Sequence, residues 1–177
     1  MKLNKFLSLI VATFVFIFSS ASIAGGFGQN YMGVQYALGK YSKEGTSQKA
    51  DPSVLLGRYG MNLHNNFSIE GRLGIGIAGD TLVFSGLEVD VEVDYMVGVY
   101  ALGHMNIAKG SSVYGLVGFT QAELTASTFG VSATDDDSGV SFGVGANLGA
   151  FNIEYIQYLN ESEYEFSALS FGFITHF

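Results

Sequence analysis

The sequence predicts an all-β protein built as an eight-stranded antiparallel up-and-down transmembrane β-barrel. Apolar residues alternate with small or polar residues in eight separate segments, which is the period of a strand with two unlike faces. The 177 residues include 24 Gly, 10 Tyr and 15 Phe but a single proline, Pro52, and proline removes a donor from the sheet ladder. The chain also ends on an aromatic residue, Phe177, at the close of a largely apolar strand face.

The first residues predict an export signal. Lys2 and Lys5 precede an almost continuous apolar run over residues 6–18, and Ser22-Ile23-Ala24 is a small-x-small site. This pattern predicts a signal peptide over residues 1–24, cleaved after Ala24. A membrane-spanning helix is the alternative, but the run is shorter than the ~20 residues that such a helix needs. Residues 25–177 then form one domain, the outer-membrane β-barrel.

The composition narrows the class of protein further. The formal net charge is −8, and phosphate contacts need Lys and Arg, so a nucleic-acid partner is not expected. The chain has no cysteine, which excludes disulfides, thiol catalysis and thiolate metal sites. An exported protein without disulfides needs another source of stability, and barrel closure supplies one.

The alternation places the strands at residues 31–39, 53–61, 67–77, 87–101, 113–123, 140–148, 151–159 and 166–177. The clearest is 87–101, where the odd positions from Leu87 to Val99 are apolar or aromatic and the even positions from Glu88 to Asp94 are acidic. A helix would spread these acids around its circumference, so a strand is predicted. The phase of strand 113–123 stays open, because apolar residues occur in both registers.

The predicted connections alternate in length. Residues 40–52, 78–86, 124–139 and 160–165 are polar and often long, whereas 62–66, 103–112 and 149–150 are shorter. Outer-membrane barrels have long extracellular loops and short periplasmic turns. An even number of strands then places both chain ends on the periplasmic side.

These features together carry a resemblance. The signal peptide, the eight strands, the loop asymmetry and the ending Phe171-Gly172-Phe173-Ile174-Thr175-His176-Phe177 resemble the small OmpA/OmpX-like barrels, described as outer membrane protein beta-barrel domain or porin family. The resemblance covers the whole mature chain. It implies a place in the outer membrane of a Gram-negative bacterium and contact with outer-membrane lipid and lipopolysaccharide. No peptidoglycan-binding domain follows the predicted barrel, so no peptidoglycan tether is expected.

The last strand has a second predicted role. Leu169, Phe171, Phe173 and Phe177 lie on one face, which we expect to meet lipid while the strand closes on the one that begins near Tyr31. The resemblance implies that these four residues form the C-terminal signal read by the barrel assembly machinery during biogenesis.

A soluble eight-stranded barrel of the lipocalin kind is the rival fold, with its apolar face turned inward around a ligand. Period-two alternation does not separate the two. The terminal Phe177, the glycine-rich faces opposite the apolar ones and the absence of Trp favour the membrane barrel.

Charged residues on the non-lipid faces predict a network in the lumen. Its candidate members are Arg58, Glu70, Arg72, Glu88, Asp90, Glu92, Asp94 and Glu154. One hypothesis is a cation-selective path. The other is a plug of ion pairs, favoured because eight strands enclose little more than their own side chains. Buried charges need partners, and because these acids outnumber the arginines, some are expected to stay hydrated or to bind cations.

The remaining polar groups offer little chemistry. Asp135, Asp136 and Asp137 fall in the longest predicted loop and could gather Ca²⁺ or Mg²⁺, but they lack the spacing of an EF-hand, so a solvated loop is favoured. His64, His104 and His176 all fall at the predicted periplasmic end, away from the outer leaflet where lipid-A-editing barrels act. No Ser-His-Asp grouping is recognisable. We therefore expect no enzyme, no cofactor and no metal site.

The sequence thus predicts a structural or surface-interaction role in the cell envelope. The outer loops, chiefly 40–52 and 124–139, are the expected binding surface for an extracellular ligand, because variable loops on a rigid scaffold commonly carry binding residues. The alternatives are a narrow porin-like channel for small solutes or cations and, less favoured, a lipid-modifying outer-membrane enzyme.

Overall fold

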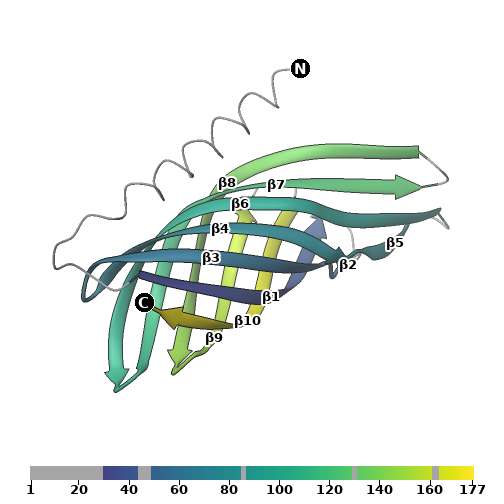
Figure 1. Cartoon of the computed structure of the whole chain (residues 1–177). Coiled ribbons are helices and arrows are strands. Elements are labelled where there is room, and N and C mark those ends of the chain that lie inside the picture. Colours follow the sequence, from purple (N-terminus) through teal and green to yellow (C-terminus); the bar gives the residue numbers. More distant parts are fainter. Residues whose placement is uncertain (1–29, 44–48, 85–86, 129–130, 161–163) are drawn as a thin grey trace.

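The computed structural model describes residues 30–43, 49–84, 87–128, 131–160 and 164–177, drawn in colour in Figure 1. The predicted signal peptide lies outside these residues. No helix in the described part of the chain is long and apolar enough to cross a membrane. The strands are β1 (Asn30–Lys43), β2 (Lys49–Ala50), β3 (Ser53–His64), β4 (Phe67–Ala78), β5 (Asp80–Phe84), β6 (Leu87–Ala108), β7 (Ser111–Thr128), β8 (Val131–Leu148), β9 (Phe151–Asn160) and β10 (Tyr164–His176).

The long strands form one closed antiparallel barrel. Pairing follows the order β10-β9-β8-β7-β6-β4-β3-β1, and β10 pairs again with β1. The closing ladder runs from Tyr31 opposite His176 to Lys43 opposite Tyr164. Because every barrel strand is thereby paired on both sides, backbone groups need no water inside a bilayer. The predicted eight-stranded barrel, with its last strand closing on its first, is confirmed.

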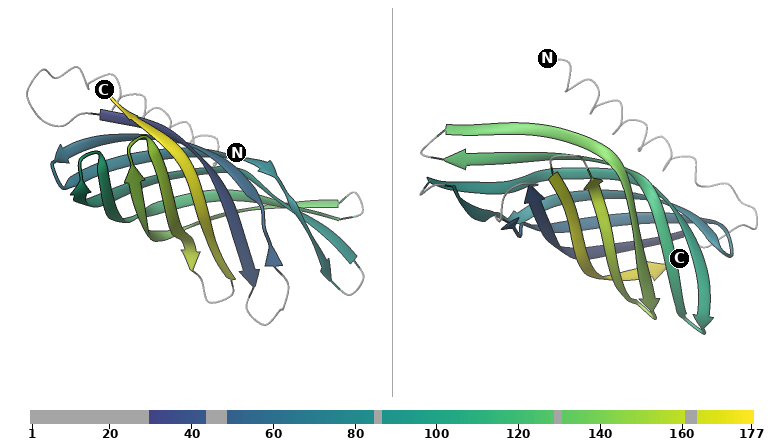
Figure 2. Two further views of the ribbon diagram at one scale, coloured as in Figure 1. Left: turned by 90° about the horizontal axis from the view of Figure 1, so that it is seen from below. Right: turned by 180° about the vertical axis from the view of Figure 1, so that it is seen from behind.

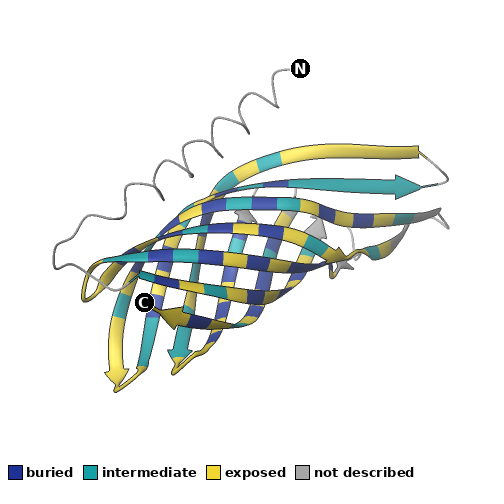
Figure 3. Cartoon of the chain, viewed as in Figure 1, coloured by how far each residue is buried: buried dark blue, intermediate teal, exposed yellow. Residues whose placement is uncertain are grey.

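Burial shows which face of the barrel is apolar. On β4, Glu70 and Arg72 are buried inside the barrel, whereas Leu73 and Ile75 are 58% and 57% exposed outside it. The same alternation of buried and exposed positions runs around the wall in Figure 3. A lipocalin-like barrel would show the reverse order, so the outward apolar belt decides for the membrane barrel.

The two ends of the barrel differ. At one end, here called the turn end, lie both described chain ends and the short turns between β3 and β4, β6 and β7, and β8 and β9. Gly110 and Gly149 have φ angles of 73° and 65°, which glycine adopts without steric cost, and Gly149 N donates to the Gly110 carbonyl at 2.7 Å. The opposite end, the loop end, carries the connections predicted to be extracellular.

Several strands are longer than predicted, and the short strands β2 and β5 lie within the connections predicted at residues 40–52 and 78–86. Residues 103–112 and 124–139 were expected as loops. Instead, β6 continues to Ala108, β7 continues to Thr128, and β8 begins at Val131. At the loop end β5, β6, β7 and β8 form a sheet that projects beyond the rest of the barrel, as Figures 1 and 2 show. Polar residues were read as loop, yet Ser and Thr pair well across strands exposed to water. We call this extension the projecting sheet.

Candidate functional site

Four charged side chains meet at the centre of the lumen. Arg58 on β3, Glu70 and Arg72 on β4, and Glu154 on β9 are each at most 4% exposed. An Arg58 Nη2–Glu70 Oε2 contact of 2.5 Å and an Arg72 Nε–Glu70 Oε1 contact of 2.6 Å join the first three. Arg72 then reaches Glu154 across the lumen through two contacts of 2.5 and 2.8 Å. We call these four residues the charge cluster.

The charge cluster is electrically balanced. Arg58 and Arg72 lie opposite each other on neighbouring strands, where two like charges repel. Glu70 binds both arginines. Glu154 binds the Nη atoms of Arg72 and lies 3.9 Å from Arg58 Nη1. Two acids therefore match two bases within the charge cluster.

Neutral groups complete the cluster. Tyr31 donates to Glu70 at 2.7 Å, and Tyr114 donates to Glu154 at 2.7 Å. Arg58 donates to the side-chain oxygen Oδ1 of Asn152 at 3.1 Å, and the Arg72 guanidinium lies 4.5 Å from the centre of the Tyr100 ring. Buried charges with this number of hydrogen bonds hold a fixed arrangement.

The inward glycines make room for these tyrosines. A Cβ added to Gly60 would lie 2.0 Å from the Tyr31 ring, and one added to Gly145 would lie 2.4 Å from the Tyr114 ring. Each tyrosine thus crosses a neighbouring strand where no side chain opposes it. The glycine-rich inner face noted in the sequence has this physical cause.

An apolar layer closes the lumen on the loop-end side of the charge cluster. Leu56, Ile156, Tyr158 and Phe166 are each at most 1% exposed and belong to one packed cluster with inward residues of β1, β6 and β7. The rings of Tyr158 and Phe166 stack with centres 5.7 Å apart. The lumen therefore contains two successive filled layers, one charged and one apolar.

The acids of β6 do not join the charge cluster. Asp90, Glu92 and Asp94 are exposed on the outside of the projecting sheet, while Val91 and Val93 are 8% and 3% exposed and face inward. The expected lumen position of these acids is therefore wrong. A register shift between Val93 and Tyr95 in the β6–β7 ladder marks a β-bulge, and one extra residue exchanges the two faces of a strand. The Glu88 side chain lies outside the described part of the structure.

The exposed acids form a surface of their own. Glu123 lies opposite Asp136 across the β7–β8 ladder, and Glu92 lies opposite Thr125 across the β6–β7 ladder, so these residues share the outer face. Thr125 Oγ1 donates to Asp94 at 2.6 Å. We call this surface the acidic face; its acids are Asp90, Glu92, Asp94, Glu123 and Asp136.

The predicted Asp135–Asp137 loop is a strand. All three residues lie in β8 and pair with β7, Asp135 opposite Leu124 and Asp137 opposite Ala122. Successive strand side chains point to opposite faces, so the three carboxylates cannot converge on one ion. Among the described residues, no group of three or more His, Asp or Glu side chains is arranged to hold a metal ion.

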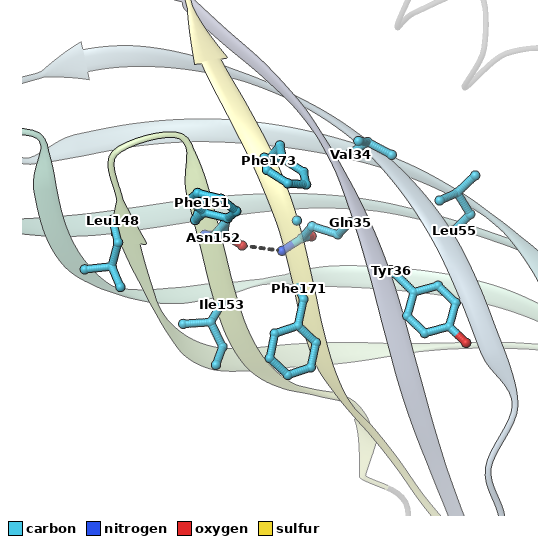
Figure 4. A pocket seen from close by; sticks show the side chains of 11 residues that line it. Val34, Gln35, Tyr36, Leu55, Leu148, Phe151, Asn152, Ile153, Phe171 and Phe173 are labelled. Atoms are coloured by element: carbon cyan, nitrogen blue, oxygen red, sulfur yellow. Dashed lines mark hydrogen bonds between the residues drawn. The ribbon is translucent and has the colours of Figure 1, made fainter.

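The C-terminal strand presents its predicted lipid face. Leu169, Phe171, Phe173 and Phe177 are between 39% and 57% exposed on the outside of the barrel. A groove of about 530 Å³ crosses β10 at Gly172, with Phe171, Phe173 and Phe151 around it (Figure 4). Their recognition by the assembly machinery stays a prediction.

Beneath this groove a side chain crosses the strand. Gln35 of β1 donates to Asn152 of β9 at 2.6 Å across the inner side of β10, the dashed line in Figure 4. A Cβ at Gly172 would lie 2.7 Å from Gln35 Cγ, so the glycine permits the crossing. Asn152 links this contact to Arg58 of the charge cluster.

The three histidines lie at the turn end, and one of them has a partner that sequence spacing does not reveal. His104 on β6 is 2.7 Å from Ser68 Oγ on β4, and Ser68 lies 3.3 Å from the Tyr31 hydroxyl. Ser68 is fully buried. His176 packs against Tyr31 with ring centres 5.5 Å apart, and His64 is exposed at the end of β3. Only the register of β4 on β6 brings Ser68 and His104 together.

A closed barrel with an apolar outer belt and a polar, filled lumen defines an outer-membrane β-barrel protein. The family model described as outer membrane protein beta-barrel domain matches residues 9–177. The chain belongs to this family, and the outer membrane is its location.

Solved structures agree on the fold. Ail, the attachment invasion locus protein of Yersinia pestis, is 20% identical with a TM-score of 0.59 over 85% of this chain and 99% of that one. Neisserial surface protein A is 13% identical with a TM-score of 0.61, covering 84% and 97%. The N-terminal barrel of Pseudomonas aeruginosa OprF is 14% identical with a TM-score of 0.54, covering 84% and 99%. No curated protein sequence matches the chain.

Proposed function

We propose that the protein acts at the cell surface through its projecting sheet, with the barrel as a membrane anchor that does not conduct. The proposal rests on one observation: the charge cluster and the apolar layer fill the lumen, and the projecting sheet extends beyond the barrel. Crossing the bilayer needs ~9–11 residues per strand, whereas β7 and β8 have 18 residues each. The additional residues of both strands are paired and ordered, which favours a rigid binding surface over a spacer.

The charge of the projecting sheet supports a choice of partner. Five carboxylates on the acidic face attract basic groups and repel sulfated or phosphorylated ones. Ail has been solved with the heparin analogue sucrose octasulfate. A ligand of that kind is unfavourable for the acidic face, so we propose a partner with a basic surface. The same carboxylates lie beside the predicted outer leaflet, where divalent cations could link them to lipopolysaccharide phosphates.

The filled lumen argues against the narrow porin. A permeating ion would have to pass both the charge cluster and the apolar layer, and dry apolar layers are costly for ions. Stable channels of reproducible conductance from refolded protein in planar bilayers would overturn this part of the proposal. The Ser68–His104 contact gives an enzyme no support, because the Ser68 side chain is fully buried.

Surface binding is testable with charge-matched variants. Proteoliposomes carrying the protein are expected to bind immobilised polylysine but not immobilised heparin. Neutralising Glu92, Glu123 and Asp136 to the amides should remove polylysine binding. The matched control neutralises Asp51, Asp80 and Glu165, three loop-end acids outside the acidic face. If both variants lose polylysine binding equally, binding depends on net charge alone and the acidic face is not a specific binding surface.

Biogenesis supplies a further proposal. Leu169, Phe171, Phe173 and Phe177 form the apolar face by which the barrel assembly machinery would recognise the chain. In support, all four lie on the outside of the terminal strand, which remains accessible until it pairs with β1. Deleting Phe177 should slow outer-membrane assembly in cells, whereas Phe151→Leu on the neighbouring strand should not.

A further inference from the structure

The turn end of the lumen holds a cavity that the surface role does not use. Its volume is about 1090 Å³, slightly above the usual size of small-molecule sites. Tyr31 and Arg58 form part of its lining, and Asn62, His104, Lys109 and His176 are among the other polar residues around it. We call it the turn-end cavity. It opens to water at the end with the short turns, which faces the periplasm in this family.

The lining of the turn-end cavity is selective in charge. The chain has 16 acidic residues and 8 basic ones, yet none of the described lining residues is Asp or Glu. An arginine, a lysine and three histidines contribute instead, together with amide and hydroxyl donors. The nearest acid of the charge cluster, Glu70, is already occupied by Arg58, Arg72 and Tyr31. A negatively charged solute therefore meets donors and no Asp or Glu side chain in the lining.

One hydrogen-bond donor of Arg58, which lines the cavity and belongs to the charge cluster, has no acceptor among the described residues. Arg58 uses Nη1 toward Asn152 and Nη2 toward Glu70, while its Nε has no partner among the described residues. Buried donors without partners are uncommon and costly, and an acceptor that approaches from the cavity would relieve this one after a small side-chain shift. Another lining residue, His104, is held by a 2.7 Å hydrogen bond with Ser68.

The cavity is a dead end. Beyond it lie the charge cluster and the apolar layer, so a solute that enters from the turn end cannot continue. From this geometry we infer that the turn-end cavity binds a phosphate group, free or carried by a lipid, from the periplasmic side. Lys109 attracts the anion by its charge, and His104 and His176 offer ring N–H donors. This inference is independent of the projecting sheet, so either can fail alone.

Phosphate provides the probe, in soluble and lipid-borne forms. The full barrel is refolded in a maltoside detergent, which contains no phosphate, and titrated with inorganic phosphate while NMR signals of His104 and His176 are followed. A second arm uses short-chain phosphatidic acid. Saturable shifts of both histidines in either arm support the site, and the responding arm identifies the source. No saturable shift in either arm would overturn the inference.

Two variants separate a site from general attraction. Lys109→Gln with His104→Gln should weaken phosphate binding at least about tenfold, as expected when a charged and a deep hydrogen-bond partner are both lost. Lys40→Gln removes an identical charge from the loop end and should leave binding unchanged. Each variant is first shown to fold by its heat-modifiable migration on a gel. Equal weakening by Lys40→Gln would refute a site in the cavity.

Discussion

Replacing Glu154 by Gln should destabilise the barrel substantially although the two side chains have the same shape. Glu154 is 1% exposed and accepts two contacts from Arg72, at 2.5 and 2.8 Å, and one from the Tyr114 hydroxyl at 2.7 Å. The amide removes the negative charge and keeps one acceptor oxygen. Arg72 then shares Glu70 with Arg58, so two positive charges face one negative charge in a closed lumen.

The size of the effect follows from the burial of the pair. Removing one partner of a buried ion pair typically costs 3–5 kcal/mol, because the other charge stays buried without compensation. The remaining oxygen of Gln and the Glu70 contact place the expected loss near the lower figure, about 3 kcal/mol. That corresponds to a change of roughly 100-fold in the folding equilibrium constant.

The assay must suit a chain without Trp. Urea unfolding of protein refolded into lipid vesicles can be followed by heat-modifiable gel migration and by circular dichroism. Glu92→Gln makes the same chemical change on the exposed acidic face and should leave the unfolding midpoint unchanged. If Glu154→Gln and Glu92→Gln shift the midpoint equally, the charge cluster does not stabilise the barrel as a buried network.

A double-mutant cycle tests the pairing itself. Replacing both Arg72 and Glu154 by Leu leaves Arg58 and Glu70, whose charges balance. The double variant should lose less stability than the two single variants together, by about 0.5–3 kcal/mol. Strict additivity would show that Arg72 and Glu154 do not act as a unit.

The other predictions concern the wall of the barrel. Gly172→Ala should cost about 1–3 kcal/mol, since its Cβ would lie 2.2 Å from the Val34 carbonyl oxygen, whereas Gly103→Ala on the open outer face should be neutral in the same urea assay. Val99→Arg should cost about 2–4 kcal/mol because Val99 is 55% exposed toward lipid, and Asp90→Arg should be tolerated because Asp90 faces water. Equal effects of the two arginines would contradict the assignment of Val99 to lipid and Asp90 to water.

Strand number, closure and the outward direction of the apolar residues could be predicted because each is local and repeated. Met32, Val34, Tyr36 and Leu38 alternate with small or polar residues, and all four are exposed on the lipid face. The pattern fixes one face of each strand, and the terminal Phe177 favours lipid over a ligand as its environment. The glycine-rich opposite faces and the absence of Trp favour the membrane barrel in the same way.

The charge cluster could be predicted only as a set of candidates. Arg72 and Glu154 are 82 positions apart, and their contact depends on the tilt and register of strands that are not neighbours in the barrel. Sequence alternation gives the face of a residue but not its height along the lumen. The Ser68–His104 contact and the Gln35–Asn152 crossing depend on register in the same way.

The error on β6 has a different cause. Valines occupy the odd positions on both sides of the bulge, so the apolar pattern continues while its direction changes. The even positions carry the signal: they are acidic up to Asp94 and become Met96, Gly98 and Tyr100 afterwards. An acidic side chain on the outer face must lie in water, outside the bilayer. Met96, Gly98 and Tyr100 are suited to the interior of the barrel. The change in the even positions after Asp94 could therefore have located the bulge.

The bulge also explains how β6 can lie partly in the bilayer and partly in water. Below it, Val99 meets hydrocarbon and Tyr100 fills the lumen; above it, Glu92 meets water and Val93 packs inward. Without the extra residue, the acids would enter a lumen whose charges are already balanced, and each would be buried without a partner. The bulge therefore keeps the charge cluster neutral and the acidic face outside, so that charge inside the barrel stabilises it while charge beyond the membrane remains available for binding.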